Sequence, residues 1–556
     1  MTEANSVCST DALAQASGSA GAAQCATNSL LRPAPTGEIS LRERLFSIDE
    51  QNSRTAPDAL TVGALIYLAL PTLIFLAGWL RWWAAIPMLA LTLVSLSQFI
   101  HRQGRHWTNP YSFGATIFIV VIAFAWASLG GAGHFFESNP DWLMRDKVLG
   151  DLTLTDWPPA YSFVDGHAHI LRTALGFFLP AAVVGKLFGI ASVDVALYLY
   201  CAIGCSLFLL LLPLPKKPGG LLLGLLLVTI LFSGMDYLGI VLITGTTPLF
   251  PLRLEWWVPF SYSSFTGAMH WAPNHAIPLL LVSVLFYRHW GHRSWPMLFM
   301  VMLPLTVIWT PFAAAAILPF LVLASWRWFA QGNQFSDSHI SFVQLLASAL
   351  LTILTLRLLT LDLAAIPALP SPTAAANWNF DTDRIALKYL LFILMEFAIL
   401  ALLLARDLRH SHGLFWLACA ILTILPLLKF GPSNDLLLRL STPCLVVILI
   451  TLIEQIAQWT KAGKIPRAGY AIALILLIGA ATPFNEMYRA ATFKASVPDY
   501  GRSLVEQHWD TEPPHYVGVA NSAWLNSVLS APTRVPNASE RRSQGLPPAA
   551  PAAVSR

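Results

Sequence analysis

The side chains best suited to chemistry are carboxylic acids gathered in one segment, residues 133–166. Asn139-Pro140-Asp141 is a helix-start signal with proline in the first turn, so Asp141 is predicted to begin a short helix lying on the membrane. A carboxylate beside a bilayer can act as a general base or bind a divalent cation. Asp141 is therefore the candidate base. Glu137 is a candidate helper and Arg145 a candidate substrate contact, while acids that merely cap short helices are the alternative.

Asp236 is the second candidate acid, and it lies at the outer end of an apolar run, in Ser233-Gly234-Met235-Asp236-Tyr237. An acid near the membrane boundary is costly to desolvate, which makes it a functional candidate. A capping or snorkelling role is the alternative. Together with Asp141 it could hold a divalent cation, the one cofactor that these acids suggest.

An aromatic stretch, residues 244–273, brings charged and hydrogen-bonding residues together with tryptophans. An interfacial aromatic belt explains the tryptophans, but it does not explain the ionisable residues among them. Aromatic faces and hydrogen-bonding groups together fit a sugar or a lipid headgroup. The predicted substrate contacts are Arg253, Glu255, Trp256, His270 and His275. The two histidines are five residues apart, which is not the helical spacing of metal ligands.

Arg439 is predicted to lie about one turn into an apolar span, after Gly431-Pro432-Ser433-Asn434-Asp435. A buried arginine needs an anionic partner. Asp435, four residues earlier, is one candidate partner. The phosphate of a lipid-linked substrate is the other, because a guanidinium group matches phosphate well.

The elements that position these residues are predicted to be membrane helices. Of 556 residues, 56% are hydrophobic and only 12% charged, against about 25% charged in an ordinary soluble domain. The apolar residues form runs of about 20, long enough to cross a ~30 Å hydrocarbon layer as helix; among them are Leu221–Ile243, Ile385–Ala405 and the last run, Ala468–Thr482. The net charge of +4 does not suggest nucleic acid, and the six cysteines show neither metal-ligand nor disulfide spacing. The sequence predicts an all-α polytopic bundle of about 13 spans, surrounded by membrane lipids.

Orientation follows from five short basic loops, which are expected on the cytoplasmic side. They contain Arg102/Arg105, Lys216/Lys217, Arg288/Arg293, Arg406/Arg409 and Lys461/Lys464/Arg467. All five face inward if Ile170–Phe188 is a re-entrant or interfacial helix rather than a full span. The N-terminus is then cytoplasmic and the C-terminus periplasmic. The acidic and aromatic segments share the outer face, where short amphipathic helices are expected.

Three parts of the chain are predicted. Residues 1–56 form a disordered cytoplasmic tail, because they are polar and lack the apolar core of a signal peptide. Residues 57–484 form the transmembrane domain, in which residues 133–190 make the first large periplasmic loop. Residues 485–556 form a short periplasmic C-terminal segment that is partly disordered, since the stretch from Pro532 to Arg556 is rich in proline, alanine and serine.

The acidic outer loop and the segment that closes it resemble the GT-C superfamily. These polytopic glycosyltransferases use polyprenyl-phosphate sugars and include protein mannosyltransferases and aminoarabinose transferases. The resemblance is carried by Asp141, Trp157-Pro158, Tyr161, Lys186-Leu187-Phe188-Gly189 and Asp236, within residues 132–439. The chain resembles more closely a set of bacterial membrane proteins that carry similar Asp-Trp, Trp-Pro and Glu-Trp-Trp segments. The chain departs from the family in three ways: its acidic loop follows the third predicted span, that loop contains no tight Asp-x-Asp or Glu-x-Asp pair, and the tail after Phe484 is too short for a large periplasmic domain.

The resemblance implies an inverting glycosyltransferase of a bacterial inner membrane, working in envelope glycan or glycolipid assembly. Asp141 would be the base, with Glu137 and Asp236 assisting. Arg439, Arg253 and Lys186 would neutralise the departing lipid phosphate. An O-antigen polymerase or ligase is the alternative enzyme, and a lipid or solute transporter is the alternative of another class. Transporters typically carry internal repeats and interrupted helices, and no convincing repeat is present.

Overall fold

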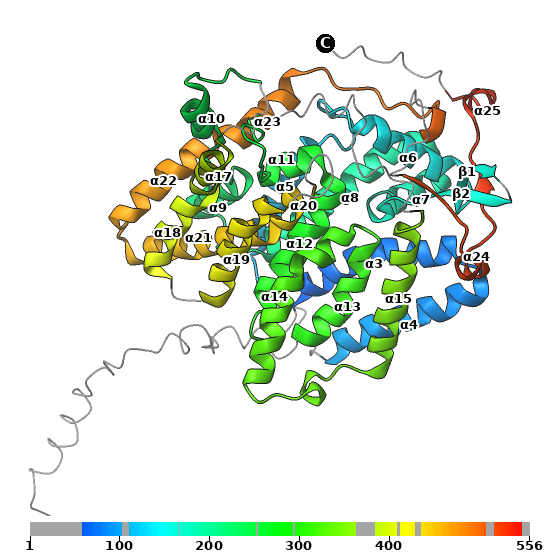
Figure 1. The fold of residues 1–556 in the computed structure, drawn as a ribbon, viewed down its shortest axis with the longest axis horizontal. Coiled ribbons are helices and arrows are strands. Elements are labelled where there is room, and N and C mark those ends of the chain that lie inside the picture. The colour runs from blue at the N-terminus through cyan, green and yellow to red at the C-terminus, as the bar shows by residue number, and fades with distance from the viewer. Residues whose placement is uncertain are drawn as a thin grey trace, which may run out of the picture. The chain divides into compact units, whose positions relative to one another are not determined.

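The computed structural model describes residues 58–102, 110–164, 166–251, 254–292, 295–362, 384–408, 412–428, 435–506 and 516–546. Within them the chain is mostly α-helical, with one four-stranded β-sheet (Figure 1). The predicted tail, residues 1–56, lies outside the described residues.

In the described part of the chain, eight helices or helical runs are long and apolar enough to cross a membrane, which confirms a membrane-embedded protein. They are Ala59–Trp79 (α3), Trp82–His101 (in α4, Trp82–Arg102), Ile190–Leu211 (containing α8, Val193–Leu211), Pro311–Ala330 (α14), Phe342–Leu359 (α15), Ile385–Asp407 (from α17, Ile385–Ile393, to α18, Ile399–Leu404), Leu437–Ala462 (containing α21, Thr442–Ala462) and Arg467–Thr492 (α22, Arg467–Gly479, and α23, Ala481–Thr492). The other predicted spans coincide with shorter helices. These are Phe113–Ser128 (α5), Gly220–Ile230 (α9), Pro273–His289 (α12), Trp295–Val307 (α13) and His412–Ile424 (α19).

The segment that the predicted topology keeps from crossing contains only a short helix. Its first residues belong to strand β2 (His167–Leu171), and the helix α7 spans Leu179–Phe188. Ten helical residues rise about 15 Å, which is half of the ~30 Å hydrocarbon layer. A re-entrant or interfacial placement of this segment therefore suits its length.

The predicted span 221–243 is wrong as a single helix. Helix α9 ends at Ile230, and α10 (Asp236–Thr244) begins only after a stretch without helix. Glycine is a poor helix former, and Gly234 lies in this break. The Met235 N–H donates to the Met395 carbonyl at 3.0 Å, so the break is held by a neighbouring helix. Asp236 consequently lies fully buried at the interruption rather than at the outer end of a span.

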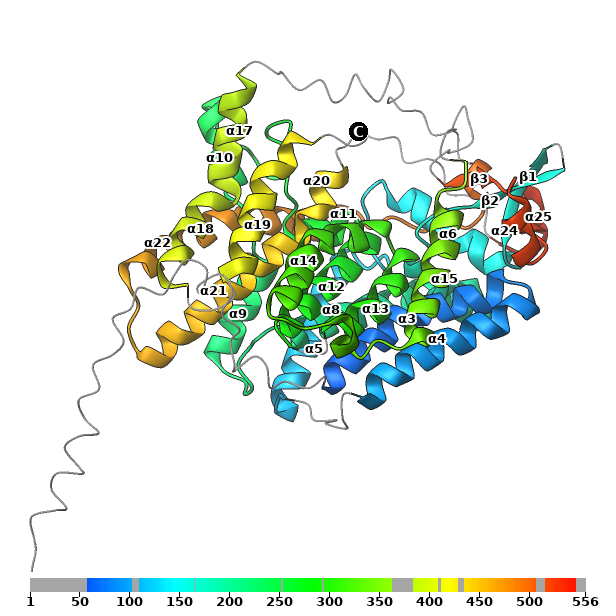
Figure 2. The same ribbon diagram turned by 60° about the horizontal axis from the view of Figure 1, so that its bottom comes forward.

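The all-α prediction is also wrong for one small region. Strands β1 (Pro159–Val164) and β2 pair antiparallel, and the C-terminal strands β3 (Val517–Val519) and β4 (Thr533–Arg534) flank them in the order β3-β2-β1-β4. Helices α24 (Ala523–Val528) and α25 (Ala538–Ser543) lie beside this sheet (Figure 2). The stretch after residue 532, predicted to be disordered, is therefore ordered as far as residue 546.

Helix α6 (Trp142–Leu154) was predicted to lie on the membrane, but nearly all of its residues are buried. Its charged side chains are paired with the C-terminal segment. Lys147 contacts the Asp499 carboxylate, and Asp151 forms an ion pair with Arg541 in which both side chains are fully buried. The charged residues of α6 are thus buried because their ion-pair partners come from a segment more than 350 residues later in the chain.

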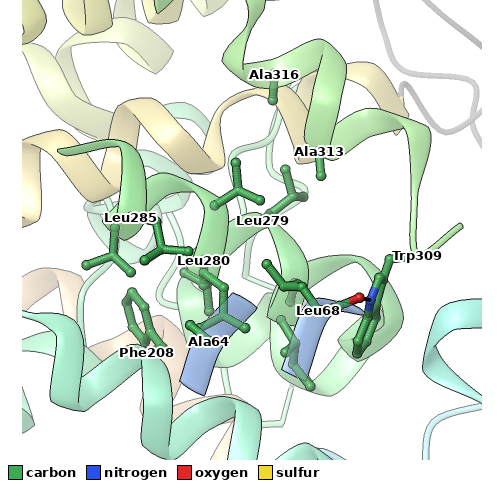
Figure 3. Close-up of a cluster of buried hydrophobic side chains, with 14 of the residues drawn as sticks. Ala64, Leu68, Phe208, Leu279, Leu280, Leu285, Trp309, Ala313 and Ala316 are labelled. Atoms are coloured by element: carbon green, nitrogen blue, oxygen red, sulfur yellow. Dashed lines mark hydrogen bonds between the residues drawn. The ribbon is translucent and has the colours of Figure 1, made fainter. Parts of the chain in front are cut away.

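A hydrophobic core between α3, α8, α12 and the start of α14 fixes the turn at residues 308–310 (Figure 3). The indole N–H of Trp309 donates to the Leu68 carbonyl at 3.1 Å. Trp309 also stacks on Tyr200, with ring centroids 5.5 Å apart. These contacts of Trp309 position the neighbouring Thr310, whose hydroxyl group contacts His275.

Candidate functional site

The loop that precedes α6 presents Asp141 to the outside of the fold. The Asp141 N–H donates to Asn139 Oδ1 at 2.9 Å, and the Asn139 amide donates to the carbonyl of His270 in α11 (Phe265–Trp271). Asp141 is the N-cap residue of α6, yet its side chain makes no capping hydrogen bond, and 59% of the side chain is exposed. Its carboxylate is therefore accessible to a substrate.

Arg145 is the nearest cation to this carboxylate. Its guanidinium lies 3.5 Å from the Asp141 carboxylate, donates to the Trp271 carbonyl and lies over the Trp142 ring at 5.3 Å. Burial lowers the pKa of Arg145, and the negative charge of Asp141 opposes this shift. Among the described residues Arg145 Nη1 is buried without a hydrogen-bond partner, so this cation retains an unused donor beside an exposed acid.

Two more predicted residues lie in the same neighbourhood. The Arg439 guanidinium, in α20 (Asp435–Leu440), lies 4.9 Å from the centre of the Phe312 ring, and its positive charge acts on Arg145. His275 Nδ1 lies 2.8 Å from Thr310 Oγ1, and the His275 ring packs edge-on against Phe312. We call Asp141, Arg145, Arg439 and His275 the Asp141 site.

A second group of ionisable residues surrounds His270 and adjoins the Asp141 site. His270 Nε2 lies 3.5 Å from Glu137 and 3.9 Å from Glu486. Trp271 donates to Glu486 at 3.2 Å, and Arg489 lies 3.5 Å from the same carboxylate. Burial raises the pKa of Glu137, and the charge of Arg489 opposes it. Glu137, predicted to assist Asp141, is thus a partner of His270, and the two groups meet at Trp271, whose carbonyl holds Arg145.

Asp236 and Glu255 occupy a separate, buried position. Asp236 accepts hydrogen bonds from Trp257 at 3.0 Å and Thr482 at 2.8 Å. Glu255 accepts from the backbone and side chain of Ser264 at 2.9 and 2.8 Å, and burial raises the pKa of Glu255 to about 8, with the charge of Asp236 adding to the shift. Trp256, predicted as the substrate contact, is half-buried; its neighbour Trp257 makes the contact with Asp236.

The predicted cation site formed jointly by Asp141 and Asp236 is not seen. The two acids have no hydrogen-bond or ion-pair partner in common among the described residues. In the same part of the chain, no group of three or more histidine, cysteine, aspartate or glutamate residues is arranged to hold a metal ion. One acid sits at an exposed helix start and the other at a buried helix break, which keeps the carboxylates from converging.

Lys186 does not join the Asp141 site. Its ammonium group donates to the Thr155 carbonyl at 2.5 Å and lies 5.2 Å from the centre of the Trp157 ring. These partners follow the last residue of α6, about 20 Å along the helix from Asp141. The structure therefore does not bring Lys186 together with Asp141, and a contact between Lys186 and the phosphate stays a prediction. Arg253 and the side chain of Asp435 lie outside the described residues.

The main residues that the sequence reasoning missed are Glu396, Glu486 and Arg489. Glu396 falls in the middle of the predicted span 385–405, and an acid inside a span is a functional candidate on cost alone, so its signal was present. Glu486 and Arg489 follow the predicted end of the last span and looked like residues of a polar tail. In the structure, the helical run continues to Thr492, places Glu486 3.9 Å from His270 and places the Arg489 guanidinium over the Trp271 ring.

His134 ties the loop before α6 to the C-terminal segment. Its Nε2 lies 3.1 Å from Asp146, and its Nδ1 lies 3.1 Å from the Ser496 carbonyl. Burial lowers the pKa of His134, but the hydrogen bond and charge of Asp146, with Asp194, outweigh burial and raise the pKa. His134 in its protonated form can donate to both partners.

An apolar groove with a cavity volume of about 500 Å³ lies between α13, α14 and α15. It is lined by residues that include Phe299, Leu303, Val307, Ala314, Leu321 and Trp328. An engineered apolar cavity of ~150 Å³ is enough to bind benzene, so this groove has room for a longer hydrocarbon. Its Val307–Ala314 end flanks the turn that carries Thr310 and Phe312, the contacts of His275.

Comparison of the chain with protein-family models, with curated proteins and with solved structures found no match. Arguments about function therefore depend on the site itself.

Proposed function

We propose that this protein is an inverting glycosyltransferase of a bacterial inner membrane that takes its sugar from a polyprenyl-phosphate donor. The observation that carries the proposal is the pairing, at the Asp141 site, of an exposed carboxylate with the buried guanidinium group of Arg145 and the half-buried Arg439. Inverting transfer needs a base on the acceptor side of the sugar and positive charge where the phosphate leaves. Asp141 is the base, and Arg145 and Arg439 bind the phosphate.

The apolar groove supports a donor with a hydrocarbon chain. Its walls α14 and α15 are themselves among the helices long enough to cross a membrane. One end of the groove flanks the turn that holds the contacts of His275. A lipid chain in the groove would leave its phosphate at the end nearest Arg439. The acceptor belongs to envelope glycan or glycolipid assembly in this proposal.

The proposal includes the GT-C-like arrangement of about 13 spans, a cytoplasmic N-terminus and a periplasmic C-terminus. Single-cysteine labelling in a cysteine-free background tests this orientation. Cysteines at positions 141 and 516 should label from outside, and a cysteine at position 217 only after permeabilisation. Labelling of position 217 from outside would contradict the topology and leave the catalytic assignment to be tested by transfer alone.

Release of polyprenyl phosphate tests the chemistry. The purified protein in lipid nanodiscs is supplied with a panel of polyprenyl-phosphate sugars, and wild type is compared with Asp141→Asn and Asp156→Asn. Loss of a general base lowers turnover by about 10²–10⁴-fold, so we expect that loss for Asp141→Asn. Asp156 is 92% exposed at the other end of α6, so its variant should turn over normally. Normal turnover by Asp141→Asn would refute the base assignment.

A proton-coupled lipid or solute transporter is the second candidate function. The interruption between α9 and α10, with Asp236 buried at it, favours this class, because broken helices form the substrate and ion sites of many transporters. Uptake of a polyprenyl-linked substrate into proteoliposomes without release of polyprenyl phosphate would favour the transporter over the transferase.

A further inference from the structure

Two helical runs are interrupted at the same place. Between α9 and α10 the chain leaves the helical path, and the facing run from α17 to α18 widens into a π turn, η6 (Leu394–Ala398). They are joined by the hydrogen bond from Met235 N–H to the Met395 carbonyl. Contact is so close that a Cβ on Gly234 would lie 2.2 Å from Glu396 Oε2. Interruptions of both kinds recur at functional sites.

The interruption brings two carboxyl groups together. Asp236 is fully buried and Glu396 is 6% exposed, and their carboxyl groups lie within hydrogen-bonding range. Asp236 already accepts hydrogen bonds from Trp257, Thr482 and Ser233. Glu396 Oε1 is buried without a hydrogen-bond partner among the described residues. Two ionised carboxylates are acceptors only, so a hydrogen bond between them requires that one carries a proton.

The described surroundings supply no cation to neutralise the pair. The neighbouring Glu255 and Glu486 are acids and offer no positive charge, and Arg489, on the helix α23 that packs against α10, faces Glu486 at 3.5 Å. Lys388 lies at the beginning of α17, about two turns before Glu396. Two uncompensated charges buried at this depth would cost several kcal/mol, and a proton removes one of them.

We propose that Asp236 and Glu396 form an intramembrane proton-binding site, in which the two carboxyl groups hold one proton between them at neutral pH. The site does not depend on sugar transfer and would serve either candidate function. Ionisable groups connect the proton-binding site to the outer loop. The charges of Asp236 and Glu486 both act on Glu255, and Glu486 lies 3.9 Å from His270. Rows of aspartate, glutamate and histidine of this kind carry protons in membrane proteins.

Infrared spectroscopy of the full chain in lipid bilayers at pH 7 tests the proposal, because a protonated carboxyl group absorbs apart from a carboxylate. Spectra of wild type are compared with Asp236→Asn and with Glu396→Gln. Each amide donates the hydrogen bond that the proton supplied, so the remaining carboxylate stays ionised. Each variant should therefore lose one protonated-carboxyl band. Asp156→Asn, which alters an exposed acid, should lose none.

Two results would overturn the proposal. Spectra of both amide variants that keep every protonated-carboxyl band would show that the pair carries no proton in the wild type. A band lost in only one variant would place the proton on a single residue. Thr482→Val removes a donor to Asp236 and keeps both carboxyl groups, so it reports on the pair even where an amide variant fails to fold. Its band should remain and shift in frequency, and an unshifted band would contradict the shared site.

Discussion

The ion pair between Arg541 and Asp151 makes the ordered C-terminal segment the most direct test of the structure. Both side chains are fully buried, and the pair joins residues 390 positions apart. Arg541 also donates to the carbonyl groups of Tyr500 at 3.1 Å and Arg502 at 3.0 Å. Replacing Arg541 by Met removes the cation and leaves the Asp151 carboxylate buried without its charge partner.

Removal of one partner from a buried ion pair costs about 3–5 kcal/mol. Because each ~1.4 kcal/mol is a factor of ten, Arg541→Met should increase the open population of the C-terminal segment by roughly two to three and a half orders of magnitude. Hydrogen exchange measured by mass spectrometry reads this directly. The Val535 N–H, which donates to the Ala160 carbonyl at 2.8 Å, should exchange faster by the same factor, up to the limit of a fully open segment.

Arg534→Gln is the matched control, since Arg534 belongs to the same segment and pairs with Glu540, but its side chain is 55% exposed. Solvent screens such pairs, so this variant should exchange like wild type. The double variant Asp151→Asn with Arg541→Met removes the orphaned charge and should recover part of the protection. Wild-type exchange in Arg541→Met, or faster exchange in the double variant than in the single one, would refute the buried pair.

Three further outcomes are expected. Because the pKa of His134 is raised in the folded protein, protonated His134 stabilises the fold below pH 6.5, and this stabilisation is lost as the pH rises through the raised pKa. Hydrogen exchange of the loop before α6 should therefore become faster over that pH range in wild type, but not in His134→Gln. Gly234→Ala should cost about 1–3 kcal/mol in denaturant unfolding because its Cβ meets Glu396, whereas Gly224→Ala, with nothing within 4 Å, should not. Ala314→Trp should fill part of the apolar groove and displace about one isoprene unit of a long-chain donor, whose burial contributes about 3 kcal/mol. Binding of the long-chain donor should therefore weaken by roughly 100-fold, and binding of a short-chain donor should not change.

The membrane helices could be predicted from the sequence because their signal is local. A run of about 20 apolar residues needs no partner to satisfy its backbone, so composition alone indicates a span. The same reasoning failed between Leu221 and Ile243, where the residues remain apolar and the helix nevertheless stops. The interruption depends on a carbonyl of the facing helix, at Met395, which accepts from Met235. No local pattern contains that information.

The environment of the acids was the hardest feature to predict. Asp141 was correctly expected at the beginning of a helix, because Asn139 and Pro140 signal one locally. The burial of Asp151 depends on Arg541, 390 residues later, and the Pro- and Ala-rich composition around Arg541 gave no indication of order. The small sheet that carries this segment forms from strands of two to six residues. Strands this short carry no recognisable alternation, so only the long-range pairing reveals them.

The partner of each acid distinguishes structural from functional carboxyl groups in this chain. Asp151 has a cation of its own and stabilises the fold with it. Asp236 and Glu396 have no cation among the described residues, although replacement by apolar side chains would remove that cost. Stability therefore does not account for their presence inside the membrane-embedded part, whereas binding a proton does. Arg145 presents the opposite imbalance: it is a buried cation beside the exposed Asp141, and one of its donors has no partner in the described part of the chain. An anionic substrate is what such a donor can bind.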